Sequence, residues 1–489
     1  MTALPIERPP PEGADAAGLA VLQARLDEDL SRLNYPPANW VQPVDHPAAG
    51  RVVDVTIVGA GMCGLAAAFS LLRLGVRNIR ILDKAPAGRE GPWVTSARME
   101  TLRSPKELTG PAAGMASLTF RAWHEAQFGR DGWARLGRIP RTMWMDYLGW
   151  YRTALRLPVE NGIEVTRIIP EDGLLRLDLA GGAAPSMLTR KVVMATGRDG
   201  LGRPYAPEFV AGLPHGVWAH SADDIDFTAL AGKRVVVVGA GASAMDNAAE
   251  ALEHGATEVR LLVRRPVMPR INKLMGIGSA GFTAGFPMLS EEWRWRFMQY
   301  ANREQTPAPR NSTQRVSRHP NASFHLGTGI RGVTCAGGEL RIDTTREKVF
   351  AADFMILATG FTVEVDVRPE LAAFADRIAL WRDRYTPPPE LADADLGRHP
   401  YLGTAFEFTE REPGTAPWLA DIHCFNHASS LSLGKVSGDI PKVSDGAAWL
   451  AQGIAGRFFR ADVERHWQWL VAYEKPELLG DEWTDAEAE

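Results

Sequence analysis

A strand–turn–helix–strand unit occurs twice in this chain of 489 residues and constrains its fold more than any other feature. In the first copy, an apolar run at 52–58 leads through a glycine-rich turn to a helical pattern at 64–74 and a second apolar run at 79–82. The second copy has the same order and begins at Lys233. Parallel strands joined by a crossover helix need a sheet covered on both faces, and continuous Val, Ile and Leu runs suit such a sheet. The sequence therefore predicts an α/β fold with two Rossmann-like dinucleotide-binding domains.

The first glycine turn, Gly59-Ala-Gly61-Met-Cys-Gly64, has the spacing of a dinucleotide-binding fingerprint. Gly59 permits the tight turn, Gly61 lets a pyrophosphate approach the backbone, and Gly64 allows the helix to pack closely on the strand. Asp83 ends the following strand, where a carboxylate can accept hydrogen bonds from a ribose. The alternative is a glycine-lined packing contact, and the full strand–turn–helix context with its acid favours the dinucleotide site.

The second glycine turn has alanine in place of the third glycine, a replacement that the fingerprint allows. It consists of Gly239-Ala-Gly241-Ala-Ser243-Ala244. The end of the next strand has no acid, and Arg264 and Arg265 stand there instead. A carboxylate would repel the 2′-phosphate of NADPH, whereas an arginine pairs with it. We therefore predict NADPH rather than NADH at this site, even if one of the two arginines is only a surface charge.

Composition narrows the class of protein. The 54 Lys and Arg residues nearly balance the 59 Asp and Glu residues, and the formal net charge of −5 argues against nucleic acid or an anionic membrane surface as the main partner. The 3 cysteines are far apart, and no Cys-x-x-Cys or His-Glu-x-x-His motif occurs, so we predict neither a reactive dithiol nor a metal site. An uncharged stretch at 55–72 fits a strand, turn and helix better than a membrane span. We expect a cytoplasmic protein without a membrane segment.

Two dinucleotide sites without a dithiol or a metal motif indicate a flavin paired with a nicotinamide, that is, FAD and NADPH. Short apolar runs that end in Thr-Gly lie on either side of the second unit, at 191–197 and 353–360. This arrangement predicts that the NADPH-binding domain is inserted into the FAD-binding domain. The predicted divisions are an N-terminal extension at 1–50, an FAD-binding domain at 51–204 and 350–489, and an NADPH-binding domain at 205–349.

These motifs resemble those of the flavin-containing, NADPH-dependent monooxygenases, a group that includes amine and sulfur oxygenases, N-hydroxylating enzymes and Baeyer–Villiger monooxygenases. The resemblance covers most of the chain, from about Val52 to about Phe459. It rests on both glycine turns, on the two Ala-Thr-Gly strands and on Gly216-Val-Trp-Ala-His220-Ser221, which is similar to the linker motif of the group. The stretch 353–361 is similar to the Asp…Leu-Ala-Thr-Gly-Tyr signature of the N-hydroxylating branch, with Phe in place of Tyr.

The resemblance implies an FAD- and NADPH-dependent monooxygenase that oxygenates a small molecule with molecular oxygen, through a C4a-(hydro)peroxyflavin protected by bound NADP+. The stretch 353–361 slightly favours oxygenation at nitrogen (N-hydroxylation), with sulfur as the other main expectation. The linker lacks the closing Trp-Pro of the Baeyer–Villiger fingerprint, which disfavours a ketone substrate. Baeyer–Villiger oxygenation stays open as an alternative, as does an NADPH oxidase or flavin-dependent reductase that inserts no oxygen.

The resemblance also implies which residues surround the flavin. Gly91-Pro-Trp93 is similar to a Gly-Gly-x-Trp stretch near the isoalloxazine, and Pro441 suits the start of a helix whose N-terminus points at the flavin. The predicted catalytic residues are Lys106, Asn426 and Ser430, against the alternatives of an exposed lysine and a hydrogen-bonded turn. The other predicted cofactor-binding residues are Lys84, Trp93, Arg98, Thr196, Gly197, His220, Ser221, Thr359 and Gly360.

A contact between two copies of the chain is a further expectation. The Trp-rich stretch 290–300 has helical spacing, and so does part of the N-terminal extension. Both segments are candidates for the interface of a homodimer.

Overall fold

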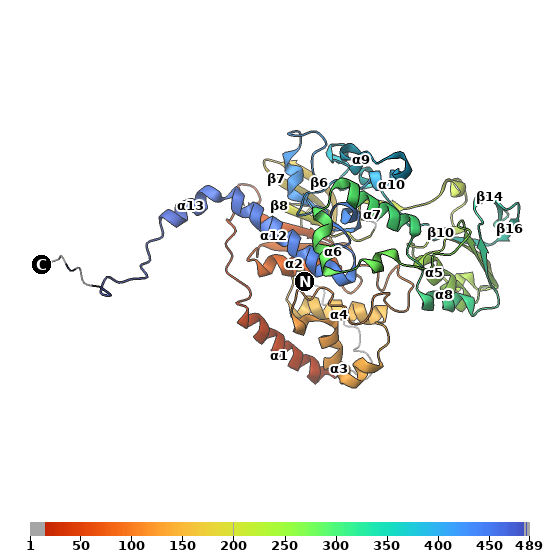
Figure 1. The fold of residues 1–489 in the computed structure, drawn as a ribbon, viewed down its shortest axis with the longest axis horizontal. Helices are drawn as coiled ribbons and strands as arrows, with labels where there is room; N and C mark the ends of the chain where they lie inside the picture. Colours follow the sequence, from red (N-terminus) through yellow and green to blue (C-terminus); the bar gives the residue numbers. More distant parts are fainter. Residues whose placement is uncertain (1–14, 199, 484–485, 487–489) are drawn as a thin grey trace.

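The computed structural model describes residues 15–198, 200–483 and 486. It has a large body and a smaller lobe, and the lobe is built mainly from the middle of the chain (Figure 1). Helix α13 (Val463–Val471) leaves the body, and the chain continues away from it (Figure 1). No helix in the described ranges is long and apolar enough to cross a membrane.

The body is built on a seven-stranded sheet that carries the first glycine turn. Its strand order is β5-β4-β3-β8-β7-β6, and β19 pairs with β8. Pairing is parallel among β5, β4, β3, β8 and β19, and antiparallel from β8 through β7 to β6. The strands are β3 (Val53–Val58), β4 (Ile79–Asp83), β5 (Val159–Asn161), β6 (Glu164–Glu171), β7 (Leu174–Ala180), β8 (Ser186–Met194) and β19 (Ile422–His423).

The first strand–turn–helix–strand unit forms as predicted. Helix α2 (Met62–Arg73) connects β3 to β4 and is buried along almost its whole length, because α12 (Val443–Ala461) packs against it. The alanines at 66–68 are all buried, and their small side chains let the neighbouring elements approach closely. The uncharged stretch at 55–72 is therefore a strand, a turn and a helix.

A layer of three helices covers another side of the body (Figure 1): α1 (Ala16–Arg32), α3 (Phe120–Arg135) and α4 (Arg141–Ala154). Helix α1, from the N-terminal extension, packs against α3 of the same chain. Phe120 and Tyr147 are fully buried between the helices, with ring centroids 5.5 Å apart. Homodimer formation stays a prediction.

The lobe contains a five-stranded parallel sheet with the order β10-β17-β11-β12-β13. Helix α5 (Ala242–Glu253) connects β11 to β12, which confirms the second unit. A separate antiparallel sheet has the order β14-β15-β16. The strands are β10 (Trp218–His220), β11 (Arg234–Val238), β12 (Glu258–Val263), β13 (Ala322–Leu326), β14 (Ile330–Ala336), β15 (Glu339–Thr344), β16 (Val349–Ala352) and β17 (Phe354–Leu357).

Strand β17 lies in a different sheet from the one that the sequence pattern predicts. The predicted FAD-binding domain resumes at 350, whereas β17 pairs with β10 and β11 inside the lobe. An ion pair accompanies this placement: Arg234 Nη2 lies 2.5 Å from Asp353 Oδ1, and the Arg234 backbone N–H donates to Oδ2 at 2.8 Å. A short apolar run suits either sheet, so the sequence pattern alone did not show which sheet contains β17.

The Trp-rich helix α7 (Glu291–Glu304) returns from the lobe to the body. The rings of Trp295 and Trp381 lie 6.3 Å apart, and Arg294 donates to the carbonyl oxygen of Ser432 at 3.0 Å. Helix α8 (Arg310–Ser317) packs against α5 instead. The shorter helices are α6 (Ala280–Gly285), α9 (Trp381–Arg384), α10 (Ala394–Gly397) and α11 (Ser430–Leu433).

Buried histidines make the fold sensitive to acid. Burial lowers the pKa of His423 to about 3, helped by the nearby Lys191, although its Nδ1 hydrogen bond to the Ala405 carbonyl oxygen opposes the shift. The pKa values of His220 and His399 are also lowered, chiefly by burial. Because the folded pKa lies below the unfolded value, stability is present above the unfolded pKa and is lost as the pH falls.

We therefore predict that the free energy of unfolding falls below about pH 6.5, by about 1.4 kcal/mol per pH unit for His423 alone. Urea denaturation at a series of pH values measures this slope. His423→Gln should make it shallower, whereas His215→Gln, at an exposed position, should leave it unchanged. Equal slopes for wild type and His423→Gln would contradict the prediction.

Candidate active site

The first glycine turn lies where β3 passes into α2. Gly59 has a φ of 104°, and a Cβ there would lie 2.5 Å from the Ala195 carbonyl oxygen. A Cβ on Gly64 would lie 1.9 Å from the Gly59 carbonyl oxygen. Gly61 differs, because a Cβ there would come no closer than 3.9 Å to another atom, the Gly91 Cα. The outer face of Gly61 is therefore free for a pyrophosphate, and no side chain caps the start of α2.

Asp83 stands beside this turn as the last residue of β4. Its Oδ2 accepts a hydrogen bond from the Ala60 amide and its Oδ1 accepts one from the Ala85 amide, each at 2.7 Å. These bonds hold the carboxylate where the ribose of a bound dinucleotide would lie. The neighbouring Lys84 is exposed, and its amine lies 3.4 Å from Glu164.

The loop after β4 places Trp93 close to the same turn. Its ring contacts that of Trp144 edge-on, with centroids 6.3 Å apart, and its carbonyl oxygen accepts a hydrogen bond from Arg141 at 2.6 Å. Gly91 in this loop is the nearest neighbour of Gly61. The predicted flavin loop and the glycine turn are thus side by side.

Asn426 is fully buried and joins the end of β8 to the C-terminal part of the chain. Its Nδ2 donates to the Met194 carbonyl oxygen at 3.2 Å and to Thr196 Oγ1 at 3.3 Å, and its Oδ1 accepts from the Ala428 amide at 3.1 Å. Thr196 Oγ1 in turn donates to the Gly200 carbonyl oxygen. The structure therefore brings together two predicted site residues, Thr196 and Asn426, and the amide of Asn426 is used within the protein.

The segment after Asn426 returns to the first glycine turn. Ser437 Oγ donates to the Asn426 carbonyl oxygen at 2.6 Å and lies 2.6 Å from Ser429 Oγ. Cys63, within the glycine turn, donates its thiol to the Ser437 carbonyl oxygen at 3.2 Å. Burial raises the pKa of Cys63 to about 12, so it stays a thiol. Ser430 is buried in α11, next to Ser429.

Helix α12 begins just beyond this segment, after a turn that contains Pro441. Ser444 in its first turn donates to the Gly110 carbonyl oxygen at 2.7 Å and accepts from the Ala113 amide at 3.0 Å. The contact of Ser437 with Cys63 places the approach to this helix beside the dinucleotide turn. The helix N-terminus there favours negative charge, which accumulates on a reduced flavin.

Four charged side chains lie near these segments in the sequence. Arg198 follows β8, and Arg103 lies in the loop between β4 and α3. Lys435 and Asp439 lie in the segment before α12. All four are exposed, yet burial lowers the pKa of Arg198 and Lys435 and raises that of Asp439.

His427 lies among these charges. Its pKa is held well below the usual value, first by burial and then by Arg198, His399 and Lys435. The imidazole is therefore neutral at pH 7 and adds no positive charge to those of Arg103, Arg198 and Lys435.

The second glycine turn is open in the same way as the first. Gly239 has a φ of 138°, and a Cβ there would lie 2.6 Å from the Ala358 carbonyl oxygen. A Cβ on Gly241 would meet nothing within 4 Å, and Ser243 in the first turn of α5 is exposed. The following Ala244 is fully buried, where a larger residue would separate helix and sheet.

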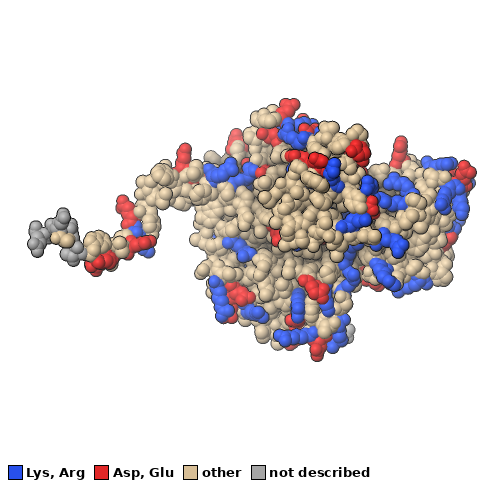
Figure 2. Space-filling model, in the orientation of Figure 1, with Lys and Arg blue, Asp and Glu red and all other residues tan. Residues whose placement is uncertain are grey.

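Arg264 and Arg265 follow β12, as predicted. Arg265 donates to the Arg303 carbonyl oxygen at 2.5 Å, whereas exposed Arg264 has no hydrogen bond or ion pair within the described part of the chain. Lys and Arg side chains gather on the lobe and along its junction with the body (Figure 2). Arg264 is thus the better placed of the two for a 2′-phosphate.

The linker residues connect the two dinucleotide sites. Buried His220 accepts from the Ala222 amide through Nδ1 at 3.1 Å, so its Nε2–H donates to the Gly360 carbonyl oxygen at 3.0 Å. The Ser221 amide donates to the Leu357 carbonyl oxygen, and Thr359 Oγ1 donates to that of Tyr205. These bonds fix the linker against the end of β17.

Arg98 spans the junction between body and lobe. One guanidinium nitrogen donates to the Thr95 carbonyl oxygen at 2.7 Å and another to that of Asp223 at 3.0 Å, in the linker. Burial lowers the pKa of Arg98 from its ordinary value. Its contacts support a role in holding the two domains together.

Lys106 contacts the end of a helix. Its amine donates to the carbonyl oxygens of Trp133 at 2.7 Å and Leu136 at 2.6 Å, and it lies 4.9 Å from the centre of the Trp133 ring. These bonds satisfy carbonyl groups at the C-terminus of α3. Contact of Lys106 with flavin or substrate stays a prediction.

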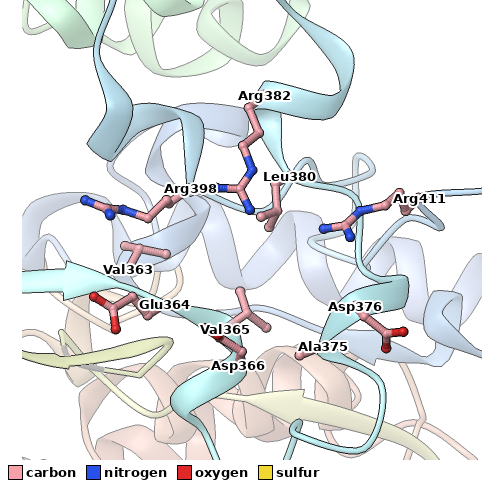
Figure 3. A pocket seen from close by; sticks show the side chains of 10 residues that line it. All are labelled: Val363, Glu364, Val365, Asp366, Ala375, Asp376, Leu380, Arg382, Arg398 and Arg411. Atoms are coloured by element: carbon pink, nitrogen blue, oxygen red, sulfur yellow. The ribbon is translucent and has the colours of Figure 1, made fainter.

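A separate hollow of about 390 Å³ lies away from both glycine turns, between β18 (Phe361–Val363) and α9 (Figure 3). Both acidic and basic side chains line it. No predicted site residue takes part in its lining, which consists of Val363, Glu364, Val365, Asp366, Ala375, Asp376, Leu380, Arg382, Arg398 and Arg411. The described residues contain no cluster of metal-binding side chains.

Comparisons with known proteins agree with this geometry. A family model described as pyridine nucleotide-disulphide oxidoreductase matches residues 56–275. The FAD-dependent urate hydroxylase of Xanthomonas campestris pv. campestris is 41% identical over 465 residues, which are 94% of this chain and 98% of that protein. The three cysteines here are free, and Cys63 and Cys424 are buried.

Two solved structures share the fold. L-lysine 6-monooxygenase from Pseudomonas syringae matches with a TM-score of 0.63 and 19% identity, over 84% of this chain and 99% of that chain. An ornithine N-hydroxylase from Kutzneria sp. 744, with reduced FAD, NADP+ and L-ornithine, matches with a TM-score of 0.63 and 17% identity, over 83% of this chain and 99% of that chain. The predicted pair of Rossmann-like domains is confirmed.

Gly59 is crowded by the backbone and Gly61 is open, and this difference gives a test. Gly61→Ala should leave the stability of the cofactor-free protein unchanged but raise the Kd for FAD at least about tenfold, because the methyl group fills only the open face. Gly59→Ala should also destabilise the cofactor-free protein by more than about 1 kcal/mol, since it combines a positive φ with a backbone clash. Absorbance titration with FAD and thermal unfolding measure both effects. Normal FAD affinity in Gly61→Ala would exclude this turn as the pyrophosphate site.

Proposed function

Because the chain belongs to the family of FAD-dependent monooxygenases that includes the urate hydroxylase of Xanthomonas campestris, we propose that it hydroxylates urate or a closely related oxopurine, with NADPH and O₂ as co-substrates. The observation that carries this proposal is 41% identity along almost the full length of both chains. In the proposed reaction, NADPH supplies two electrons, one oxygen atom enters the substrate, and the other leaves as water.

The residues around the first glycine turn fit FAD. We assign the pyrophosphate to the open face of Gly61 and the start of α2, and the ribose to Asp83. Trp93 and the start of α12 stand where the isoalloxazine would follow. When bound and reduced, FAD supplies the oxygen-activating chemistry, which in this proposal passes through a C4a-(hydro)peroxyflavin.

The second glycine turn fits NADPH. Gly241 and Ser243 offer an open helix start to the pyrophosphate, and Arg264 offers a charge to the 2′-phosphate. His220 and Arg98 hold linker and body together, so that the nicotinamide can be brought against the flavin in a defined position.

Oxygenation at nitrogen or sulfur is the second candidate, and the shared fold with N-hydroxylating enzymes is compatible with it. The stretch 353–361 gives it little support, however. Asp353 is paired with Arg234 at the start of β11, and β17 is a buried strand. The aspartate of the signature therefore pairs with a neighbouring strand in this structure.

The test uses the purified holoenzyme with NADPH, urate and labelled O₂. Consumption of urate in proportion to NADPH, with label in the organic product, is the expected result. Return of reduced flavin to the oxidised form with stoichiometric hydrogen peroxide, with or without urate, would favour an oxidase. Turnover of amines or thioethers in place of urate would favour the second candidate.

The arginine pair provides a prediction about the coenzyme. Replacing Arg264 and Arg265 by serine should raise the KM for NADPH roughly 10- to 100-fold, because charge-assisted bonds to the 2′-phosphate are lost. The KM for NADH, which lacks this phosphate, should change by less than about threefold. Lys348→Ser, at an exposed position of the lobe, is the control. Equal effects on both coenzymes would contradict the assignment.

A further inference from the structure

We propose that the C-terminal arm, residues 463–483, packs onto a second copy of this chain, on a receiving surface formed by residues 267–288. The inference is independent of the proposed function, because neither segment contains a residue assigned to FAD, NADPH or substrate. It places the interface of a homodimer away from the two segments that the sequence pattern favours, 290–300 and the N-terminal extension.

Those two favoured segments bury apolar side chains within their own chain. Leu22, Leu26 and Leu30 of α1 are buried, and α1 packs against α3. Trp295 of α7 is buried in a cluster with Trp381. Apolar surface for a second copy must therefore come chiefly from elsewhere.

The C-terminal arm offers such a surface. Every residue from Trp467 to Trp483 is exposed. Trp467, Leu470 and Val471 recur at helical spacing and are 64%, 68% and 64% exposed, and Tyr473 is 69% exposed. A run of large apolar side chains left in water marks a contact site for another molecule.

The first turn of α13 holds the arm in a direction that leads away from its own body (Figure 1). Arg465 donates to Gln42 Oε1 at 3.0 Å, and the imidazole of His466 stacks on Phe459 with ring centroids 4.4 Å apart. Beyond this anchor the chain continues outward, and its side chains face solvent rather than the body. Cover for them must come from another molecule.

The receiving surface is the other stretch of the described chain in which exposed large apolar side chains gather. Val267 and Ile271 are 65% and 64% exposed, and Met275 and Met288 are 75% and 85% exposed. Because both stretches belong to one chain, a dimer with two-fold symmetry covers each of them twice, once in each copy.

The charges of the two stretches are complementary. Residues 267–288 contain Arg270 and Lys273 and no acidic residue, whereas acidic residues outnumber basic ones at 463–483. Acidic side chains lie along the arm in Figure 2. Arg270, Lys273, Glu474 and Glu477 are all exposed, so opposite charges can meet across the interface.

The apolar area of the arm suits a stable dimer. An enclosed aromatic side chain buries about 150–250 Å², and Trp467, Trp469, Tyr473 and Trp483 each have more than half of their surface exposed. Two arms with the surfaces that they cover therefore approach the about 1,200–2,000 Å² that a specific interface buries. The acidic residues of the arm disfavour an anionic membrane as the partner, because membrane-surface helices are rich in Lys and Arg.

The oligomeric state of the full-length holoenzyme tests the proposal. Sedimentation equilibrium is expected to show a dimer for the wild type. Trp467→Ser with Leu470→Ser should raise the dimer Kd at least about 100-fold, because central apolar contacts are lost. Val21→Ser with Leu33→Ser, at exposed apolar positions of the α1 region, is the matched control and should leave the Kd unchanged. FAD content and melting temperature show whether each variant is folded.

A charge exchange tests the receiving surface. Arg270→Glu with Lys273→Glu should raise the dimer Kd roughly 3- to 10-fold, because like charges then face one another. Glu474→Lys with Glu477→Lys should have a similar effect for the same reason. All four substitutions in one chain should restore most of the affinity, which two independent losses would not do.

A wild-type holoenzyme that stays monomeric at the highest concentration would overturn the proposal, as would a dimer that survives the serine substitutions in the arm. A dimer that these substitutions dissociate, but whose affinity the charge exchange does not restore, would overturn the assignment of residues 267–288. The measurements need no turnover, so failure of the proposed function would leave their outcome unchanged.

Discussion

The buried side chain of Asn426 is the interaction on which the arrangement of the site depends. It joins the end of β8 to a distant segment, because its contacts with Met194 and Thr196 span 232 and 230 residues of sequence. The main-chain carbonyl oxygen of Asn426 also accepts a hydrogen bond from Ser437, whose own carbonyl oxygen accepts one from Cys63 in the first glycine turn. A fully buried amide must satisfy its hydrogen bonds, and these bonds fix three segments in one place. That connection holds the approach to α12 beside the dinucleotide turn.

The junction between lobe and body has polar contacts beside the apolar cluster that joins α7 to the body. Arg98 contacts the linker at Asp223, and Arg315 of α8 donates to the Arg98 carbonyl oxygen at 3.2 Å. Polar interfaces of this kind permit small domain movements more easily than apolar ones. Such movement suits a protein in which a nicotinamide must approach the flavin and then make room for a substrate.

Local chemistry made the two glycine turns predictable, because strand, glycine spacing and the following residue all lie within one short stretch. The placement of β17 was not predictable, since a four-residue apolar strand suits either sheet, and its partners β10 and β11 lie far away in sequence. The meeting of the segments that follow β8 and precede α12 was not predictable for a related reason. No local motif links them, and they are joined by the hydrogen bonds of Asn426 with Thr196 and Ser437.

Asn426 and Lys106 illustrate how the polar groups of a predicted site residue can be bonded within the protein. Asn426 is a predicted catalytic residue, and the structure shows its side-chain amide bonded to neighbouring segments. Lys106 is also a predicted catalytic residue, and its amine donates to carbonyl groups at the end of α3. Sequence identifies residues with the capacity for polar contacts, but the backbone groups that take up those contacts depend on tertiary structure.

The fold alone does not identify the substrate of this chain. The same pair of Rossmann-like domains occurs in enzymes named for lysine and ornithine. The chain as a whole carries a formal charge of −5, yet the groups that face one another before α12 are mainly cationic. Net charge therefore gives no guide to the ligand of an enclosed site, where low polarity strengthens the effect of a few local groups. A fold that supplies flavin and nicotinamide in a fixed relation can serve many substrates, and the side chains around the flavin determine which of them is held.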